Sequence, residues 1–272
     1  MKKVFSLLRG GYIGLIFALL YLPVALMIIL SFNASNSAYT WTGFSLWKYE
    51  KLFANEVIVE ALGTTVLVGF ISAALATVIG TLGCLGMLAM RKRLQKAVST
   101  AVNIPLLNAD IVTGVTLMLF FEAFVERSLG TLLVSHITLI LPYVILNVYP
   151  KLTQLDNNVY EAALDLGASP AKAFFKVILP EIFPGVLTGF LLALTISLDD
   201  FTITFFTAGR GLNTLSTYIY NSYKIRGIMP EYYALTTLMF VAVLALILVV
   251  QVVNVRSAGK SAAAGDTSKK RI

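Results

Sequence analysis

Four carboxylates lie inside long apolar segments of this 272-residue sequence: Asp110, Glu122, Asp199 and Asp200. None has an obvious Lys or Arg partner within its own segment. Charged side chains in a membrane are costly, so they usually face a bundle interior or a water-filled cavity and serve a function. An unpaired anionic lining attracts cations, and several separated carboxylates suit an extended polycation better than a point ion. The alternative is that these carboxylates bond to nearby Ser, Thr or backbone groups.

The positions of these carboxylates predict different roles for them. Asp110 is about a dozen residues into its apolar segment, near mid-bilayer at about 1.5 Å per residue. Pro105 frees a backbone carbonyl just before it, which predicts a local break or a water-filled pocket. Asp199 and Asp200 lie in the outer half of a later segment, and adjacent helix positions diverge by about 100°. We therefore expect one to face the path and the other to cap or brace a neighbouring helix.

The elements that carry these residues are membrane helices. The chain is 58% hydrophobic and 13% charged, with a mean hydropathy of +0.83, which is far from the balance of a globular domain. Runs without a charged residue, such as Ala61 to Met90, are long enough to cross a hydrocarbon core of about 30 Å. We predict an all-α polytopic membrane protein whose transmembrane domain covers residues 1–256. Its six transmembrane helices are expected at about 11–32, 62–90, 98–125, 129–149, 183–206 and 232–255.

The distribution of basic residues predicts the orientation in the membrane. Most of the 21 Lys and Arg residues fall in connections on the same side as the N-terminus, which predicts that both termini are cytoplasmic. The net charge of +7 therefore reflects membrane topology and contact with lipid headgroups rather than nucleic-acid binding. The single cysteine, Cys84, excludes an intrachain disulfide and disfavours a Cys-based metal site. Residues 257–272 form a small, polar and basic tail that we predict to be disordered.

Three further features allow more than one interpretation. Trp47 lies in "WTGFSLWKYEKLF", which predicts an interfacial amphipathic helix, so its ring either anchors that helix or contacts a substrate or partner. His136 is predicted to be a hydrogen-bonded packing residue rather than a proton relay. Glu122 and Glu126 are four residues apart on one helix face, where they either contact a receptor protein or are solvated.

A charged stretch, Tyr160 to Pro180, interrupts the apolar sequence and predicts helix, turn, helix. Glu161 falls in the first turn, where a carboxylate complements the helix dipole, and Gly167 stands where a left-handed C-cap would stop the helix. Ser169 and Pro170 then provide an N-cap and a first helical residue. A helix this short gains little stability alone, so it either docks against another protein or lies on the membrane surface as an interfacial helix.

This stretch resembles the signature of permease subunits in ABC importers, in which "EAA", three residues, Gly, nine residues and "I-x-L-P" follow one another. The matching residues are Glu161, Ala162, Ala163, Gly167, Leu179 and Pro180, with Val177 in place of the usual Ile. The resemblance implies a type I ABC importer permease fold with a cytoplasmic coupling segment at 151–181. It also implies that the first short helix, which includes Leu166, sits in a cleft of an ATPase subunit.

The same resemblance implies a set of partners. They are a second homologous permease subunit, two cytoplasmic ATPase subunits that bind ATP and Mg, an extracytoplasmic receptor protein, and membrane lipid. The chain itself would bind no cofactor and no metal, and would be a transport subunit rather than an enzyme. It would reside in the cytoplasmic (inner) membrane of a bacterium.

A narrower resemblance covers Leu8 to Val255 and includes the motifs "NADIVTG" and "SLDDF". In these motifs the chain is similar to the second permease subunits of bacterial spermidine/putrescine importers. The resemblance implies polyamine uptake and a substrate pathway at Trp47, Asp110, Ser197, Asp199 and Asp200. Two alternatives stay open: an ABC permease for another substrate, and a proton-coupled secondary transporter or channel in which the acidic residues carry protons.

Overall fold

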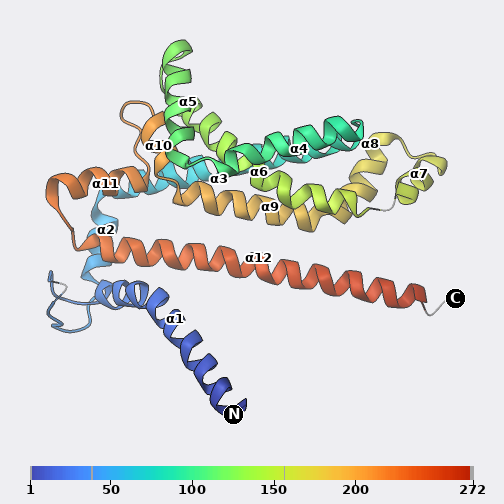
Figure 1. Cartoon of the computed structure of the whole chain (residues 1–272). Helices are drawn as coiled ribbons and strands as arrows, with labels where there is room; N and C mark the ends of the chain where they lie inside the picture. Colours follow the sequence, from blue (N-terminus) through green and yellow to red (C-terminus); the bar gives the residue numbers. More distant parts are fainter. Residues whose placement is uncertain (1, 38, 156, 270–272) are drawn as a thin grey trace. The chain divides into compact units, whose positions relative to one another are not determined.

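The computed structural model describes residues 2–37, 39–155 and 157–269, and their secondary structure is helical apart from an isolated bridge between Asn33 and Phe44. The chain forms two units, one of Met1–Ala61 with Tyr218–Leu244 and the other of Leu62–Thr217 with Ala245–Ile272. Figure 1 shows the helices coloured along the sequence. Among the described residues, five helices are long and apolar enough to cross a membrane, or up to six if one bent pair is a single span.

The first unit contains α1, α2 and the beginning of α12. Their bounds are Lys2–Ser31 for α1, Trp47–Ala54 for α2 and Glu231–Lys269 for the whole of α12. The helix predicted in the segment around Trp47 is therefore present as α2. The helix α12 also continues through the residues for which composition predicts disorder, as far as Lys269. The run of alanines at 262–264 and the absence of proline favour helix there.

The second unit is built around a closely packed helix pair, α6 and α9, which lie side by side (Figure 1). Its elements are α3 (Glu56–Leu88), α4 (Lys92–Leu107), α5 (Asp110–Phe124), α6 (Leu129–Thr153), α7 (Asn157–Asp165), α8 (Pro170–Ala173), the π-helical turn η1 (Phe174–Ile178), α9 (Leu179–Asp199), α10 (Thr202–Thr207) and α11 (Leu215–Arg226). The straddling helices α3 and α11 begin or end in the first unit.

Glycines allow the close approach of α6 and α9. A Cβ added to Gly189 would lie 3.3 Å from the Cα of Val144, and one added to Gly185 would lie 2.9 Å from the carbonyl oxygen of Asn147. Small residues of this kind let membrane helices pack backbone against backbone. Val144 and Ile182 are fully buried in the core that forms around this pair.

Two of the predicted spans are broken rather than continuous. The segment expected at 98–125 forms α4 and α5, which bend by 103° at Asn108 and Ala109. Both linking residues are extended, with ψ of 145° and 136°, and the break predicted from Pro105 is confirmed. The prediction of a single helix at 183–206 is wrong, because α9 ends at Asp199 and α10 starts at Thr202.

Candidate functional site

The first break places Asp110 at the start of a helix. Asp110 is the first residue of α5 and its side chain is exposed. A carboxylate at this end complements the positive end of the helix dipole, so the position is electrostatically favourable even without a basic partner. The sequence predicted a break near Pro105 but not that Asp110 would be the first residue of the helix that follows it.

The second break separates the two neighbouring aspartates. Asp199 is the last residue of α9 and is exposed. Its carboxylate stands at the negative end of the helix dipole, which disfavours an anion and favours a nearby cation. Broken membrane helices use their carbonyl-rich C-terminal ends in this way to bind cations. Asp199 is therefore the carboxylate in this unit whose position most favours a cationic ligand.

Asp200 has a structural role instead. Its side chain is 5% exposed and caps the first turn of α10. One carboxylate oxygen accepts a hydrogen bond from the backbone N–H of Ile203 at 3.1 Å. The other accepts from the backbone N–H and the hydroxyl of Thr204, at 2.8 Å and 3.0 Å. The expectation that one of the two aspartates caps a neighbouring helix is confirmed for Asp200, which bonds to Thr and backbone groups as the alternative interpretation held. Asp199 is exposed, and its predicted position facing the path stays a prediction.

His136 lies in a buried polar network with residues of α9 and α10. Its Nδ1 is 2.6 Å from the hydroxyl of Ser197, and its Nε2 is 3.0 Å from the hydroxyl of Thr204. His136 is 1% exposed and Ser197 is 3% exposed. The prediction of a hydrogen-bonded packing histidine is confirmed. Ser197 is buried against this histidine in the structure, so its predicted place in the substrate pathway stays a prediction.

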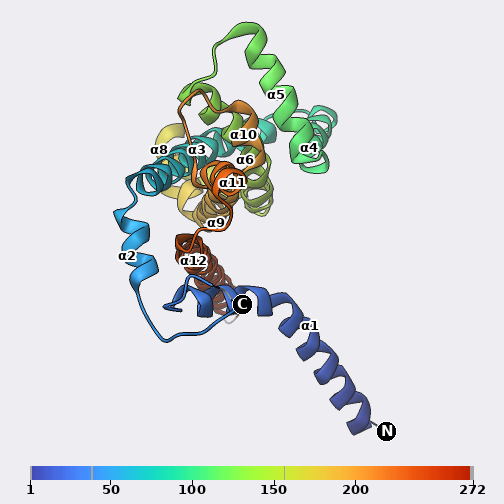
Figure 2. The same cartoon turned by 90° about the vertical axis from the view of Figure 1, so that its left-hand side faces the viewer.

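Packing of α5 on α10 brings the two breaks together (Figure 2). A Cβ on Gly114 would lie 2.9 Å from Phe206 and 3.4 Å from the carbonyl oxygen of Thr202. Gly114 is one turn after Asp110, and Thr202 comes directly after the second break. The sequence did not indicate this proximity, because Gly114 resembles any small residue of an apolar helix. The resulting site is a pair of helix breaks that carry Asp110 and Asp199.

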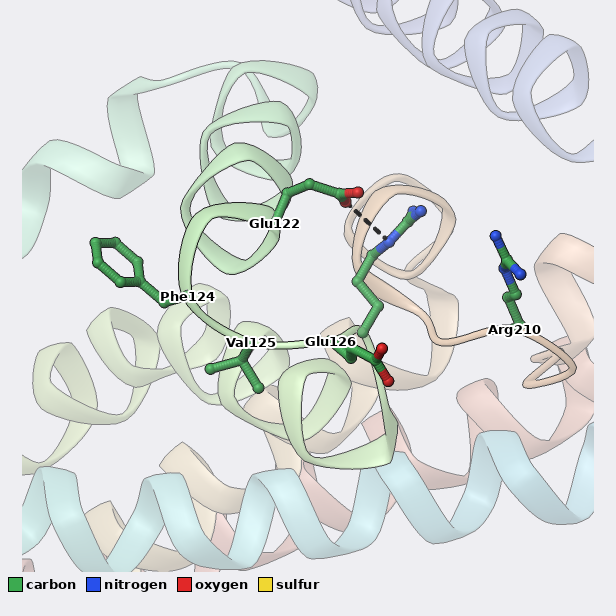
Figure 3. Close-up of a pocket in the computed structure, with 6 residues that line it drawn as sticks. Glu122, Phe124, Val125, Glu126 and Arg210 are labelled. Carbon is green, nitrogen blue, oxygen red and sulfur yellow. Dashed lines mark ion pairs between the residues drawn. The ribbon is translucent and has the colours of Figure 1, made fainter.

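The connection from α5 to α6 borders a cavity of mixed charge (Figure 3). Its volume is about 610 Å³, and its lining residues are Glu122, Phe124, Val125, Glu126, Arg127 and Arg210. Nε of Arg127 lies 3.4 Å from Oε2 of Glu122. Glu122 therefore does have a basic partner, which was not evident from the sequence because the two residues meet only where the chain turns after α5. The cavity presents both charges and is not a simple trap for cations.

In the first unit, Trp47 is held by contacts within the chain. Its indole N–H donates to the carbonyl oxygen of Asn33 at 3.3 Å. The amino groups of Lys48 and Lys51 each lie 6.0 Å from its ring centroid, within the outer range of a cation–π contact. These contacts favour anchoring of the outer segment by Trp47, and its predicted contact with substrate stays a prediction.

Two lysines of α2 fasten this helix within the first unit. Lys48 is 1% exposed, donates to the carbonyl oxygen of Leu30 at 2.6 Å and lies 4.8 Å from the ring centroid of Tyr233. Burial lowers the pKa of the Lys48 amino group below its ordinary value. Lys51 pairs at 3.1 Å with Glu231, which is 1% exposed in the first turn of α12.

The charged segment has the local structure that its sequence predicts. Gly167 has a φ of +82° after α7, and its N–H donates to the carbonyl oxygen of Leu164 at 2.8 Å. The N–H of Ala168 donates to the carbonyl oxygen of Ala163 at 3.1 Å, which completes a Schellman C-cap. Ser169 then accepts a hydrogen bond from the N–H of Lys172 at 3.4 Å and caps α8. The predicted helix, glycine stop and Ser-Pro restart are confirmed. The predicted place of Glu161 in the first turn is wrong, because α7 starts at Asn157 and Glu161 is its fifth residue.

The surface of this segment is suited to docking. Glu161 and Ala162 are exposed, and Leu166 is 89% exposed although it is apolar. The chain then passes through the π-helical turn η1 into α9, which starts at Leu179 and Pro180. Turns of this kind are rare and occur frequently at functional sites. Among the described residues there is no cluster of three or more His, Cys, Asp or Glu side chains that could hold a metal ion.

The fold and the capped segment define a multi-pass permease of the ABC importer type. Solved structures of this class share the fold: a bacterial ABC transporter for import of the acidic polysaccharide alginate contains a chain with a TM-score of 0.66 and 18% identity, covering 94% of this chain and 96% of that one. A chain of the MetNI methionine ABC transporter has a TM-score of 0.55 and 20% identity, covering 76% of this chain and 95% of that one.

Residues 3–258 match the family described as "Binding-protein-dependent transport system inner membrane component", and the chain belongs to this family. It is 36% identical over 248 residues to the spermidine/putrescine transport system permease protein PotC of Haemophilus influenzae, with 91% of this chain and 96% of the relative covered. It is 34% identical over 235 residues to the putrescine transport system permease protein PotI of Escherichia coli K12, with 84% and 83% covered.

Proposed function

We propose that this chain is the permease subunit of an ATP-driven importer for polyamines, with spermidine or putrescine as substrate. The observation that carries the proposal is the exposed carboxylate of Asp199 at the carbonyl-rich end of α9, beside a second helix break that starts with Asp110. The similarity of this chain to the spermidine/putrescine permease PotC and the putrescine permease PotI supports the same substrate class.

The site chemistry suits a chain of ammonium groups. One ammonium is attracted by the Asp199 carboxylate together with the negative end of the α9 dipole. A second ammonium of an extended substrate needs another anion at some separation, and Asp110 on the neighbouring break provides it. Transport requires that these contacts be stronger in the state that accepts substrate than in the state that releases it.

Energy enters through partner subunits in this proposal. Two cytoplasmic ATPase subunits bind ATP and Mg, and the segment from Glu161 to Pro180 docks on one of them. The exposed Leu166 supplies an apolar contact for the docking. The helix α9 starts in this segment and ends at Asp199, so movement of its first turn is transmitted along one helix to the candidate site.

The remaining partners complete the transport complex. A second, homologous permease subunit shares the membrane, and an extracytoplasmic receptor delivers the polyamine. Both termini lie in the cytoplasm, as the distribution of Lys and Arg favours. We assign five residues of this chain to polyamine uptake: Trp47, Asp110, Ser197, Asp199 and Asp200. Of these, Asp199 and Asp110 contact the substrate directly.

The decisive experiment is uptake of labelled spermidine and putrescine into vesicles that contain the whole reconstituted complex. We expect uptake that depends on both ATP and the receptor. Absence of ATP-dependent polyamine uptake, in a complex that hydrolyses ATP, overturns the proposed substrate. A proton ionophore separates the rival class, because a proton-coupled transporter loses uptake with the gradient whereas this complex keeps it while ATP lasts.

A further inference from the structure

We propose that His136 is a positioning residue for Asp199. His136 positions Asp199 through a hydrogen-bonded chain of four side chains, which we name the turn network: Ser197, His136, Thr204 and Asp200. The turn network fixes the bend between α9 and α10 and so sets the direction of the neighbouring Asp199 side chain. The inference deepens the proposed function, since Asp199 is the carboxylate assigned to substrate there.

The turn network joins three helices at one buried point. His136 comes from α6, Ser197 from α9 and Thr204 from α10, and these side chains are 1%, 3% and 0% exposed. Asp200, 5% exposed by its side chain, lies in the bend itself. Buried polar networks are rigid when each member has its partners, and they specify one arrangement of the backbone around them.

The direction of each hydrogen bond follows from the chemistry of the groups. A carboxylate only accepts, so the hydroxyl of Thr204 donates its single proton to Asp200 at 3.0 Å. The Thr204 oxygen must then accept from Nε2–H of His136 at 3.0 Å. The neutral ring leaves Nδ1 as an acceptor, and the hydroxyl of Ser197 donates to it at 2.6 Å. Asp200 Oδ2 is 3.7 Å from Nε2, too long for a hydrogen bond, so Thr204 is the link.

This arrangement controls the backbone on both sides of Asp199. Ser197 holds the last turn of α9 two residues before Asp199, and Asp200 holds the first turn of α10 immediately after it. Asp199 lies between these two fixed points and is exposed, and they determine the direction of its side chain. Asp200 takes an extended conformation with ψ of 128°, so the chain leaves the helix at this residue. Ser197 and Asp200 thus serve uptake from inside the protein, without contact with substrate.

The first experiment measures the position of residue 199 without any substrate. Asp199→Cys is made in a Cys84→Ala background, and its rate of reaction with a small maleimide is measured in the assembled complex. His136→Phe keeps a ring but removes both hydrogen bonds, and we expect it to change this rate about fivefold or more. His136→Gln retains an N–H near Nε2 and should lie closer to the parent.

Thr138→Val is the matched control for the labelling experiment. Thr138 is on the same helix as His136, but its hydroxyl donates to the carbonyl oxygen of Val134 within that helix rather than to the turn network. We expect an unchanged labelling rate. If His136→Phe does not assemble with its partners, Thr204→Val, which cuts the same chain at the next link, takes its place. Equal labelling rates in the parent and in the network variant overturn the inference.

The second experiment uses transport and a double-mutant cycle. His136→Phe should raise KM for spermidine about tenfold with little loss of maximal rate, and His136→Gln should restore part of it. In an Asp199→Asn background the same change should have no further effect, because its target is already gone. Additive effects overturn the positioning role. A wild-type complex that takes up no polyamine contradicts the proposed function instead, and the labelling experiment still tests the network.

Discussion

Leu179 and Asp199 are the first and last residues of one α-helix, α9. Leu179 belongs to the segment that matches the ABC permease signature, and Asp199 is the exposed carboxylate at the break before α10. A helix of 21 residues is about 30 Å long, which is the thickness of a hydrocarbon core. The proposed docking site for the ATPase and the proposed cation site therefore stand at the two ends of a single rigid element.

Asp199→Asn should weaken uptake by removing the charge while it keeps the shape. We expect KM for spermidine to rise about tenfold, because a charge-assisted contact is replaced by a neutral one. Asp199→Glu should retain part of the affinity. Glu50→Gln, at an exposed carboxylate of α2, is the control and should leave uptake unchanged. A wild-type KM in the Asn variant would contradict a contact between Asp199 and the substrate.

Leu166→Asp should separate the permease from its ATPase partners. The leucine side chain is 89% exposed at the end of the capped helix, so the substitution costs little within the chain itself. We expect less ATPase to co-purify with the permease and a loss of uptake, whereas Leu166→Met should behave as wild type. Co-purification of normal amounts of ATPase with the Asp variant contradicts docking at this surface.

Gly167→Ala tests whether the C-cap of α7 matters for coupling. The backbone there has a φ of +82°, and an added Cβ would meet no atom within 4 Å, so the cost is conformational only. That cost is about 1 kcal/mol, and it should loosen the capped helix and reduce ATP-driven uptake. Gly83→Ala is the matched control, because its Cβ also meets no atom but its backbone is helical. Equal uptake by the two variants would contradict a role of the C-cap in coupling.

Gly114→Ala should disturb the packing that brings the two breaks together. Its Cβ would lie 2.9 Å from a ring carbon of Phe206, so α5 and α10 must move apart or the ring must shift. We expect a lower melting temperature in detergent and reduced polyamine uptake. Gly86→Ala, where a Cβ meets no atom, should be neutral or slightly stabilising. Unchanged uptake in a normally folded Gly114 variant contradicts a site that spans both breaks.

The buried Lys48 predicts a pH dependence of stability. Burial lowers the pKa of Lys48 in the folded protein, so between that pKa and the unfolded value of about 10.4 the unfolded state binds more protons. The free energy of unfolding therefore rises as pH increases through that window. Below the window, the full cost of burying the charged Lys48 amino group destabilises the folded protein. Between neutral and alkaline pH, the melting temperature of the wild type should rise relative to that of Lys48→Met. A difference between the two proteins that is constant with pH contradicts this cause.

The local features of the capped segment were predictable because each depends on neighbours in the chain. Gly167 stops a helix through its own backbone freedom, and Ser169 caps the next one through a hydrogen bond three residues away. The break after Pro105 was predictable for the same reason. The partner of Glu122 and the two roles of Asp199 and Asp200 could not be assigned, because they depend on where the chain turns and on which donors α10 presents.

By itself, the sequence determined that the chain is a set of membrane helices with a capped, charged interruption, because hydropathy and capping act over a few residues. It also placed the carboxylates in apolar segments, where their cost marks them as functional. The tertiary structure decided that Asp110 and Asp199 are exposed while Asp200 is buried as a helix cap. Packing of α5 on α10 and the buried contacts of His136 join residues that are more than sixty positions apart, and no local pattern specifies such contacts.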